Sequence, residues 1–84
     1  MGGVIHIDRF GNVITNIRGE DLPGEVFIEV CGRRIEGLSA SYVEGGELLA
    51  IVGSSGKLEV AARNRSAAVL LGAKVGDEIR ITRR

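Results

Sequence analysis

The chain has 84 residues, room for a single domain with a thin core, because a domain of this size buries only about 60 to 65 per cent of the surface that its unfolded chain exposes. Eleven basic residues balance eleven acidic ones, so no net field attracts the domain to nucleic acid or to an anionic membrane. The one cysteine, Cys31, excludes an internal disulfide and a cysteine-based zinc site. We expect it to be a small core residue.

Targeting and metal signals are weak throughout the sequence. No apolar run approaches the roughly 18 residues of a membrane span, and the start of the chain leads into a strand pattern without a signal peptide. One histidine, His6, offers little for metal binding or acid–base chemistry. We therefore expect a cytoplasmic domain without a metal, a cofactor or a membrane anchor.

The first informative stretch is IDRFGNVITNI, in which polar residues interrupt a strand pattern. Val4–Asp8 and Val13–Ile17 read as two strands rich in β-branched residues, and Gly11 followed by Asn12 predicts a tight turn between them. This hairpin carries a carboxylate and a carboxamide near its tip. Their simplest role is to cap the turn with side-chain to backbone hydrogen bonds, which is the usual fate of such residues beside glycine.

The middle of the chain predicts a second hairpin. Arg18–Gly24 reads as a loop, and Glu25–Cys31 as a strand with Val26, Ile28 and Val30 on one face. Gly32 then opens a short turn into Arg33–Gly37. Leu38–Gly46 has no hydrophobic period, and we expect it to be a surface loop that carries Tyr42.

The last part of the chain predicts a third hairpin, a helix and a final strand. The expected elements are a strand buried on both sides at Glu47–Val52, a turn at Gly53–Gly56, a strand at Lys57–Ala61, a helix at Ser66–Leu71 with Ser66 as N-cap and Gly72 as its stop, and a strand at Val75–Thr82 with Ile79 and Ile81 facing inward. Closure removes the unpaired edges of a thin all-β domain. The fold prediction is therefore a small, closed, mostly antiparallel barrel of six or seven short strands with one short helix, in one domain spanning residues 1–84.

Three polar loops are candidates for a binding site. Ser54 and Ser55 lie in a Gly-Ser-Ser-Gly tip whose N–H groups and hydroxyls suit a carboxylate or phosphate, although such turns are common and usually only turn. Tyr42 is a possible stacking platform for a base, or an aromatic folded onto the barrel end. Asn12 can pair with an adenine edge, and Asp8 can hold an ammonium group.

Several motifs, taken in order, resemble one family. IDRFGN-x-x-TNI, the later Tyr42, GELLAIVGSSGKLEVA, SAAVLLGA and VGDEIRI are similar to the C-terminal domain of the S-adenosylmethionine hydroxide adenosyltransferases, a family that includes the fluorinase and chlorinase enzymes. The resemblance covers nearly all of the chain. It implies a barrel that forms the adenine-binding and methionine-binding side of an S-adenosylmethionine pocket. The other side would come from the N-terminal domain of a neighbouring subunit in a trimer.

The resemblance also implies roles for single residues. Asp8 would bind the methionine amino group, Asn12 the adenine edge, and Ser54 with Ser55 the methionine carboxylate. Phe10 would line the pocket, Tyr42 would stack near the adenine, and the segment around Asn64 would add adenine contacts, largely through its backbone. This segment departs from the family, because Ala62–Ser66 contains arginines where small or amide residues are expected.

The resemblance assigns no catalytic residue to this chain. In the family the Asp, Arg and His that activate water belong to the N-terminal domain, and water activation needs a positioned base in a closed site. We therefore expect a ligand-binding half that is inactive without a partner domain or chain.

Two alternatives remain open. One is a structural or interaction barrel that has lost the ligand. The other is a small nucleic-acid module. It is less favoured than the ligand-binding reading, because the chain has a single loop aromatic and zero net charge. It would depend on clustering of Arg33, Arg34, Arg63, Arg65, Arg83 and Arg84.

Overall fold

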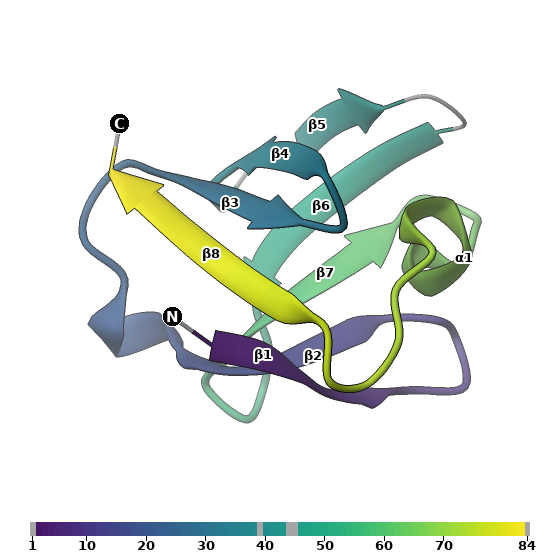
Figure 1. Ribbon diagram of the computed structural model, residues 1–84, viewed down its shortest axis with the longest axis horizontal. Coiled ribbons are helices and arrows are strands. Elements are labelled where there is room, and N and C mark those ends of the chain that lie inside the picture. Colours follow the sequence, from purple (N-terminus) through teal and green to yellow (C-terminus); the bar gives the residue numbers. More distant parts are fainter. Residues whose placement is uncertain (1, 39, 44–45, 84) are drawn as a thin grey trace.

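The computed structural model describes residues 2–38, 40–43 and 46–83, and it describes side chains everywhere in these ranges except at residues 40–43. These residues form eight strands, a 3-10 helix and one short α-helix (Figure 1). The strands are β1 (Gly2–Ile7), β2 (Val13–Arg18), β3 (Val26–Val30), β4 (Arg33–Glu36), β5 (Ala40–Val43), β6 (Gly46–Val52), β7 (Lys57–Ala62) and β8 (Glu78–Arg83), and the helices are η1 (Gly19–Asp21) and α1 (Ala67–Leu71).

All described strand pairs are antiparallel, and the strands follow the order β4-β3-β8-β1-β2-β7-β6-β5. The sheet curves so far that Cα atoms of its two end strands, β4 and β5, come within 8 Å of each other. Figure 1 shows the result, a nearly closed barrel with α1 at one end. The predicted fold class is confirmed. Closure protects the two sheet edges that an open sheet would expose.

One strand was not expected from the sequence. Within Leu38–Gly46, predicted as a loop, Ala40–Val43 forms β5, with Ala40 opposite Leu49 and Val43 opposite Gly46. Pairing with β6 satisfies the backbone groups on one side of this edge strand, although its side chains show no period. The described part of the chain therefore has eight strands rather than six or seven. Tyr42 belongs to this strand and not to a loop, and its side chain lies outside the described residues.

The core follows from alternation along the strands. The predicted inward-facing residues of β3 are buried, as is Ile79 of β8, whereas Ile81 is only partly buried against the core. The fully buried core includes Ile28, Ile35, Leu48, Leu58 and Ile79. Burial of both faces of Glu47–Val52 was a wrong prediction. Leu48 and Ala50 face inward, but Ile51 is 44 % exposed and Val52 is 43 % exposed. A strand in a single-layer barrel has one face on the core and one outside, however apolar its sequence.

Cys31 is an exposed residue and not the small core residue that we expected. Cys31 and Gly32 have φ values of 51° and 78° in the two-residue turn between β3 and β4. Such turns match the twist of the strands best when both residues have positive φ, and they lie outside the core. Two main effects raise the pKa of the Cys31 thiol. The larger is partial burial, and the second is its hydrogen bond to the Asp77 carboxylate at 3.4 Å.

The helix prediction is confirmed, including both ends. The Ser66 hydroxyl accepts a hydrogen bond from the Val69 N–H at 3.1 Å, and Gly72 ends the helix with φ of 66°. Ala67 and Leu71 are buried and extend the core of the barrel. Among the described helices, none is long and apolar enough to cross a membrane.

Candidate functional site

The turn between β1 and β2 is organised by the Asp8 carboxylate. Its Oδ1 accepts hydrogen bonds from the backbone N–H groups of Phe10 and Asn12, both at 2.9 Å, and its Oδ2 accepts one from the Asn12 side-chain Nδ2 at 3.1 Å. The Asp8 backbone adds an N–H to the Asn12 carbonyl at 3.1 Å and accepts from the Gly11 N–H at 2.9 Å. The capping role predicted for Asp8 and Asn12 is therefore present.

These contacts fix the charge and the orientation of both side chains. Hydrogen bonding from the Asn12 N–H is the largest effect that lowers the pKa of Asp8, so the carboxylate is ionised near neutral pH. Only the nitrogen of a carboxamide can donate to a carboxylate. The Asn12 Oδ1 atom is therefore directed away from Asp8, together with the second hydrogen of Nδ2.

Gly11 attaches this turn to the helix. It is buried, with φ of 84°, and a methyl group in place of its hydrogen would overlap the Ser66 hydroxyl. Its carbonyl accepts a hydrogen bond from the Ala68 N–H at 2.9 Å. Ser66 therefore caps α1 and packs under the turn as well. The N-cap pattern predicted the first role, but the sequence carries no signal for the second.

Phe10 stands at the tip of the same turn and is 67 % exposed. The guanidinium of Arg9 lies over its ring, 5.1 Å from the centroid. In a chain with three aromatic residues, an aromatic side chain outside the core is a feature of interest. It gives the turn that holds Asn12 an exposed apolar surface.

Asn64 lies at the same end of the barrel. It is exposed, with φ of 55°, in the turn that leads from β7 to Ser66. Arg63 precedes it and is anchored on the start of β6, since its Nε lies 2.7 Å from Glu47 Oε1 and its N–H donates to the Glu47 carbonyl at 3.2 Å. The backbone of Tyr42 lies opposite Glu47, so it also belongs to this end.

Ser54 and Ser55 lie at the opposite end of the barrel. Their turn is closed by the Gly56 N–H on the Gly53 carbonyl, at 2.9 Å, and the Gly56 carbonyl accepts from the Gly19 N–H at 2.8 Å. Along β7, the four residues from Lys57 to the level of Asn12 correspond to about 13 Å of extended strand. The structure thus brings Asp8, Phe10, Asn12 and Asn64 to one end, and leaves Ser54 and Ser55 at the other.

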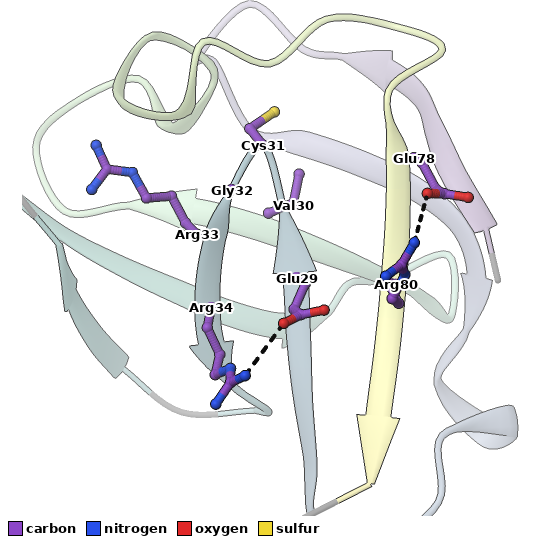
Figure 2. A pocket seen from close by; sticks show the side chains of 8 residues that line it. All are labelled: Glu29, Val30, Cys31, Gly32, Arg33, Arg34, Glu78 and Arg80. Atoms are coloured by element: carbon purple, nitrogen blue, oxygen red, sulfur yellow. Dashed lines mark hydrogen bonds and ion pairs between the residues drawn. The ribbon is translucent and has the colours of Figure 1, made fainter.

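The hollows described on the surface lie away from the Asp8–Asn12 turn. The largest, about 430 Å³, lies between the β3–β4 hairpin and β8 (Figure 2). Arg34 lies 3.5 Å from Glu29 and Arg80 lies 3.6 Å from Glu78, and Arg33 lines the hollow as well. Cys31 stands at its rim, in the turn. The hollow is therefore lined by three arginines and two glutamates.

Two smaller hollows complete this picture. One of about 390 Å³ lies beside η1 and includes Asn16, and one of about 330 Å³ includes Ser55 and Gly56. The residues gathered around Asn12 line none of these three hollows. Across the described residues, no group of three or more His, Cys, Asp or Glu side chains is placed to hold a metal ion.

Comparisons with known proteins show the family of the chain. The family described as the SAM hydroxide adenosyltransferase C-terminal domain matches residues 2–80. An (R)-S-adenosyl-L-methionine hydrolase of Thermus thermophilus is 41 % identical over 81 residues, covering 95 % of this chain and 31 % of the relative. A hydrolase with the same name from Methanocaldococcus jannaschii is 32 % identical over 89 residues, covering 93 % of this chain and 34 % of the relative.

Solved structures give the same result. A conserved hypothetical protein of Thermus thermophilus superposes with a TM-score of 0.78 at 41 % identity, over 95 % of this chain and 32 % of that structure. An uncharacterized conserved protein of Thermotoga maritima gives a TM-score of 0.74 at 36 % identity, over 98 % of this chain and 35 % of that structure. The chain spans about a third of the length of these relatives. It belongs to the S-adenosylmethionine hydroxide adenosyltransferase family, of which it represents the C-terminal domain.

Proposed function

We propose that this barrel is the non-catalytic, ligand-binding half of an S-adenosylmethionine hydroxide adenosyltransferase, and that it binds the adenosyl part of S-adenosylmethionine at the Asp8–Asn12 turn. A second domain or chain supplies the rest of the pocket and the groups that activate water. The relatives named as hydrolases of S-adenosylmethionine, about three times as long as this chain, support this division of labour.

The fixed carboxamide of Asn12 carries the proposal. Its Nδ2 is held by Asp8, so its Oδ1 and its second Nδ2 hydrogen are presented together, without a search through rotamers. This donor–acceptor pair matches the exocyclic amine and a ring nitrogen of adenine. The exposed ring of Phe10 adds an apolar surface beside it. Preorganisation of this kind lowers the entropy cost of binding.

The roles of Ser54, Ser55 and Tyr42 remain predictions. A contact of both serines with the methionine carboxylate needs a ligand that extends to the far end of β7. The same molecule cannot place its amino group on Asp8 in this chain, because the amino and carboxylate groups of methionine are attached to one carbon atom. In this proposal, the main role of Asp8 is to hold the side chain of Asn12. The cytoplasmic location expected from the sequence also remains a prediction.

A nucleic-acid function is disfavoured by the way the arginines are used. Of the arginines on which that function would depend, Arg34 and Arg63 each lie within salt-bridge distance of a glutamate. Arg18 and Arg80, elsewhere on the barrel, are paired in the same way. These pairs are distributed over both ends of the barrel and do not form a basic stripe. A purely structural barrel is the remaining alternative, and ligand titration separates it from the proposal.

The direct test is an NMR titration of the chain with adenosine and with S-adenosylmethionine. Half a pocket leaves the ligand partly solvated, so we expect dissociation constants in the high micromolar to millimolar range, roughly −4 to −5.5 kcal/mol. Resonance shifts should fall on Asp8–Asn12 and Asn64. Shifts confined to other residues, or no shifts at millimolar ligand, would contradict the proposal.

A pair of asparagine variants provides the matched control. Asn12→Ala removes the presented carboxamide and one hydrogen bond to Asp8, whereas Asn16→Ala removes one hydrogen bond from the Gly3 N–H at an exposed site of β2. Both should lower the free energy of unfolding by a similar amount, about 0.5 to 1.5 kcal/mol. Only Asn12→Ala should abolish the adenosine shifts. Equal binding by both variants would leave Asn12 with a structural role alone.

Catalysis is tested by incubating the chain alone with S-adenosylmethionine. We expect no adenosine above the background of the buffer, because the described residues include no positioned base in a closed site. Adenosine release that scales with protein concentration and survives repurification would overturn the assignment as a non-catalytic half.

A further inference from the structure

The β1–β2 turn and the start of α1, far apart in the sequence, satisfy each other's backbone groups at one end of the barrel (Figure 1). The first N–H groups of an α-helix have no partner within the helix. In α1, the Ala68 N–H donates to the Gly11 carbonyl at 2.9 Å, and the Val69 N–H donates to the Ser66 hydroxyl at 3.1 Å. The turn and Ser66 therefore cap the helix together.

The helix takes its own position from the core of the barrel. It has only five residues, and a helix of this length is not stable without tertiary contacts. Ala67 is fully buried and Leu71 is 7 % exposed, and both belong to the core cluster. The start of α1 is consequently a fixed support on which the β1–β2 turn can rest.

The contact between the helix and the turn is made by Ser66 and Gly11. A methyl group added to Gly11 would overlap the hydroxyl and Cβ of Ser66 and come within 2.7 Å of its Cα. The Gly11 backbone therefore rests directly on Ser66, with no room for another atom between them. Asn12 follows Gly11 in the chain, so a shift of Gly11 also shifts the Asn12 carboxamide.

Resting on the proposed function, we propose that Ser66 is a positioning residue for the adenosyl ligand, because its hydroxyl supports Gly11 and so sets where the Asn12 carboxamide meets adenine. Asp8 fixes the rotation of this carboxamide through the bond from Nδ2 at 3.1 Å. Asp8 belongs to the same turn, however, and would move with it. The contact with Ser66 connects the turn to the core through α1. Support of this kind matters because a binding group must be held within about 0.5 Å of its productive position.

The test compares three variants of the full chain. Ser66→Ala removes both the hydroxyl and the helix cap, whereas Ser66→Gly removes the same hydroxyl at little cost to the cap, because glycine is an accepted N-cap residue. Gly72→Ala is the control, since it strains the far end of α1, where φ is 66° and there is open space. Ser66→Ala and Gly72→Ala should lower the melting temperature by similar amounts, roughly 4 to 8 °C.

Two NMR measurements report the position of the carboxamide and its effect on binding. The Nδ2 of Asn12 is held by Asp8, so its two proton resonances should be well separated without any ligand, and the side-chain amide of Asn16, further along β2, is the reference in the same spectrum. Both Ser66 variants should bring the two Asn12 resonances closer together and raise the dissociation constant of adenosine at least about threefold. Gly72→Ala should change neither quantity.

The outcomes separate this proposal from the proposed function. Adenosine affinity equal to that of the unmodified chain in both Ser66 variants would overturn the proposal and leave Ser66 as a helix cap alone. Equal weakening by Gly72→Ala would also overturn it, because the effect would then follow the stability of α1 and not the contact with Gly11. Failure of the unmodified chain to bind adenosine would reject the proposed function, and the Asn12 resonances, which need no ligand, would still decide whether Ser66 positions the carboxamide.

Discussion

The two polar turns at the ends of β2 and β7 look alike in sequence and differ in construction. Each contains glycine and short polar residues, and each has a glycine with φ near 84°. The Asp8–Asn12 turn is held by three contacts to one carboxylate and is packed on α1 through Gly11. The Gly53–Gly56 turn has exposed serines, and around Gly56 there is open space.

The difference teaches that the position of a binding group is set by what packs behind it. Asn12 has Asp8 on one side and a turn anchored to the helix beneath it, so its carboxamide is fixed before any ligand arrives. Ser54 and Ser55 have no comparable support among the described contacts of the barrel. We therefore expect the first turn to provide specificity and the second to adapt to its ligand.

Each of the two turns has one positive-φ glycine, Gly11 or Gly56. Alanine at these two positions should give the largest difference in stability between the turns. Gly56→Ala introduces only backbone strain, about 1 kcal/mol. Gly11→Ala adds an overlap with Ser66 to the same strain and should lower the free energy of unfolding by about 3 kcal/mol or more. Urea unfolding followed by circular dichroism measures both. Equal losses would mean that the Asp8–Asn12 turn is free to move away from α1.

Substitution of a serine in each region should give a smaller difference. Ser66→Ala removes the N-cap of α1 and the hydroxyl under Gly11, with an expected loss of about 1 kcal/mol in the free energy of unfolding. Ser55→Ala changes an exposed turn residue and should stay within about 0.5 kcal/mol of the unmodified chain. Thermal unfolding of the two variants side by side is sufficient. A larger loss from Ser55→Ala would indicate that the second turn is also built on buried contacts.

Of the two turns, acid should destabilise only the Asp8–Asn12 turn. This effect should be smaller than those of the glycine and serine substitutions. The folded state lowers the pKa of Asp8 below its ordinary value of 3.8, so its contribution to stability is fully present above that pH. The contribution is lost as the pH falls through the lower, folded-state pKa. Melting temperatures of the unmodified chain and Asp8→Asn should therefore converge below pH 3.8. Ser54→Ala, the control, should stay parallel to the unmodified chain at every pH.

Local signals predicted most of the fold. Gly32, Gly53 and Gly56 marked the hairpin turns, and Ser66 with Gly72 marked both ends of α1, because turns and caps depend on the conformational range of a few residues. Ala40–Val43 was missed because its strand conformation comes from pairing with β6, which the pattern of its own residues does not indicate. Cys31 was misplaced because a small apolar residue does not show that its backbone must have positive φ.

The candidate site was predictable in parts. The contact of Asp8 and Asn12 with the turn follows from their residue types and spacing, and the structure agrees with it. Which candidates lie together depends on how the strands pair. The distance of Ser54 and Ser55 from Asn12 follows only once β2 is known to run antiparallel to β7. Likewise, Ile14 and Ile51, far apart in sequence, come to lie in one row only because both pair with Glu59.

The position of β8 in the sheet has a consequence for the order of folding. β8 is the last strand of the described chain and lies between β3 and β1, so the β3–β4 hairpin joins the sheet through a strand more than forty residues later, as in the pairing of Val30 with Ile79. Long-range pairing of this kind slows folding, because the intervening loop must be closed before the contacts form. The barrel cannot assemble from its beginning as the chain is synthesised. Until β8 is in place, the β3–β4 hairpin is separate from the five-stranded part β1-β2-β7-β6-β5, and each has an exposed edge. These are the species that chaperones or aggregation would meet first.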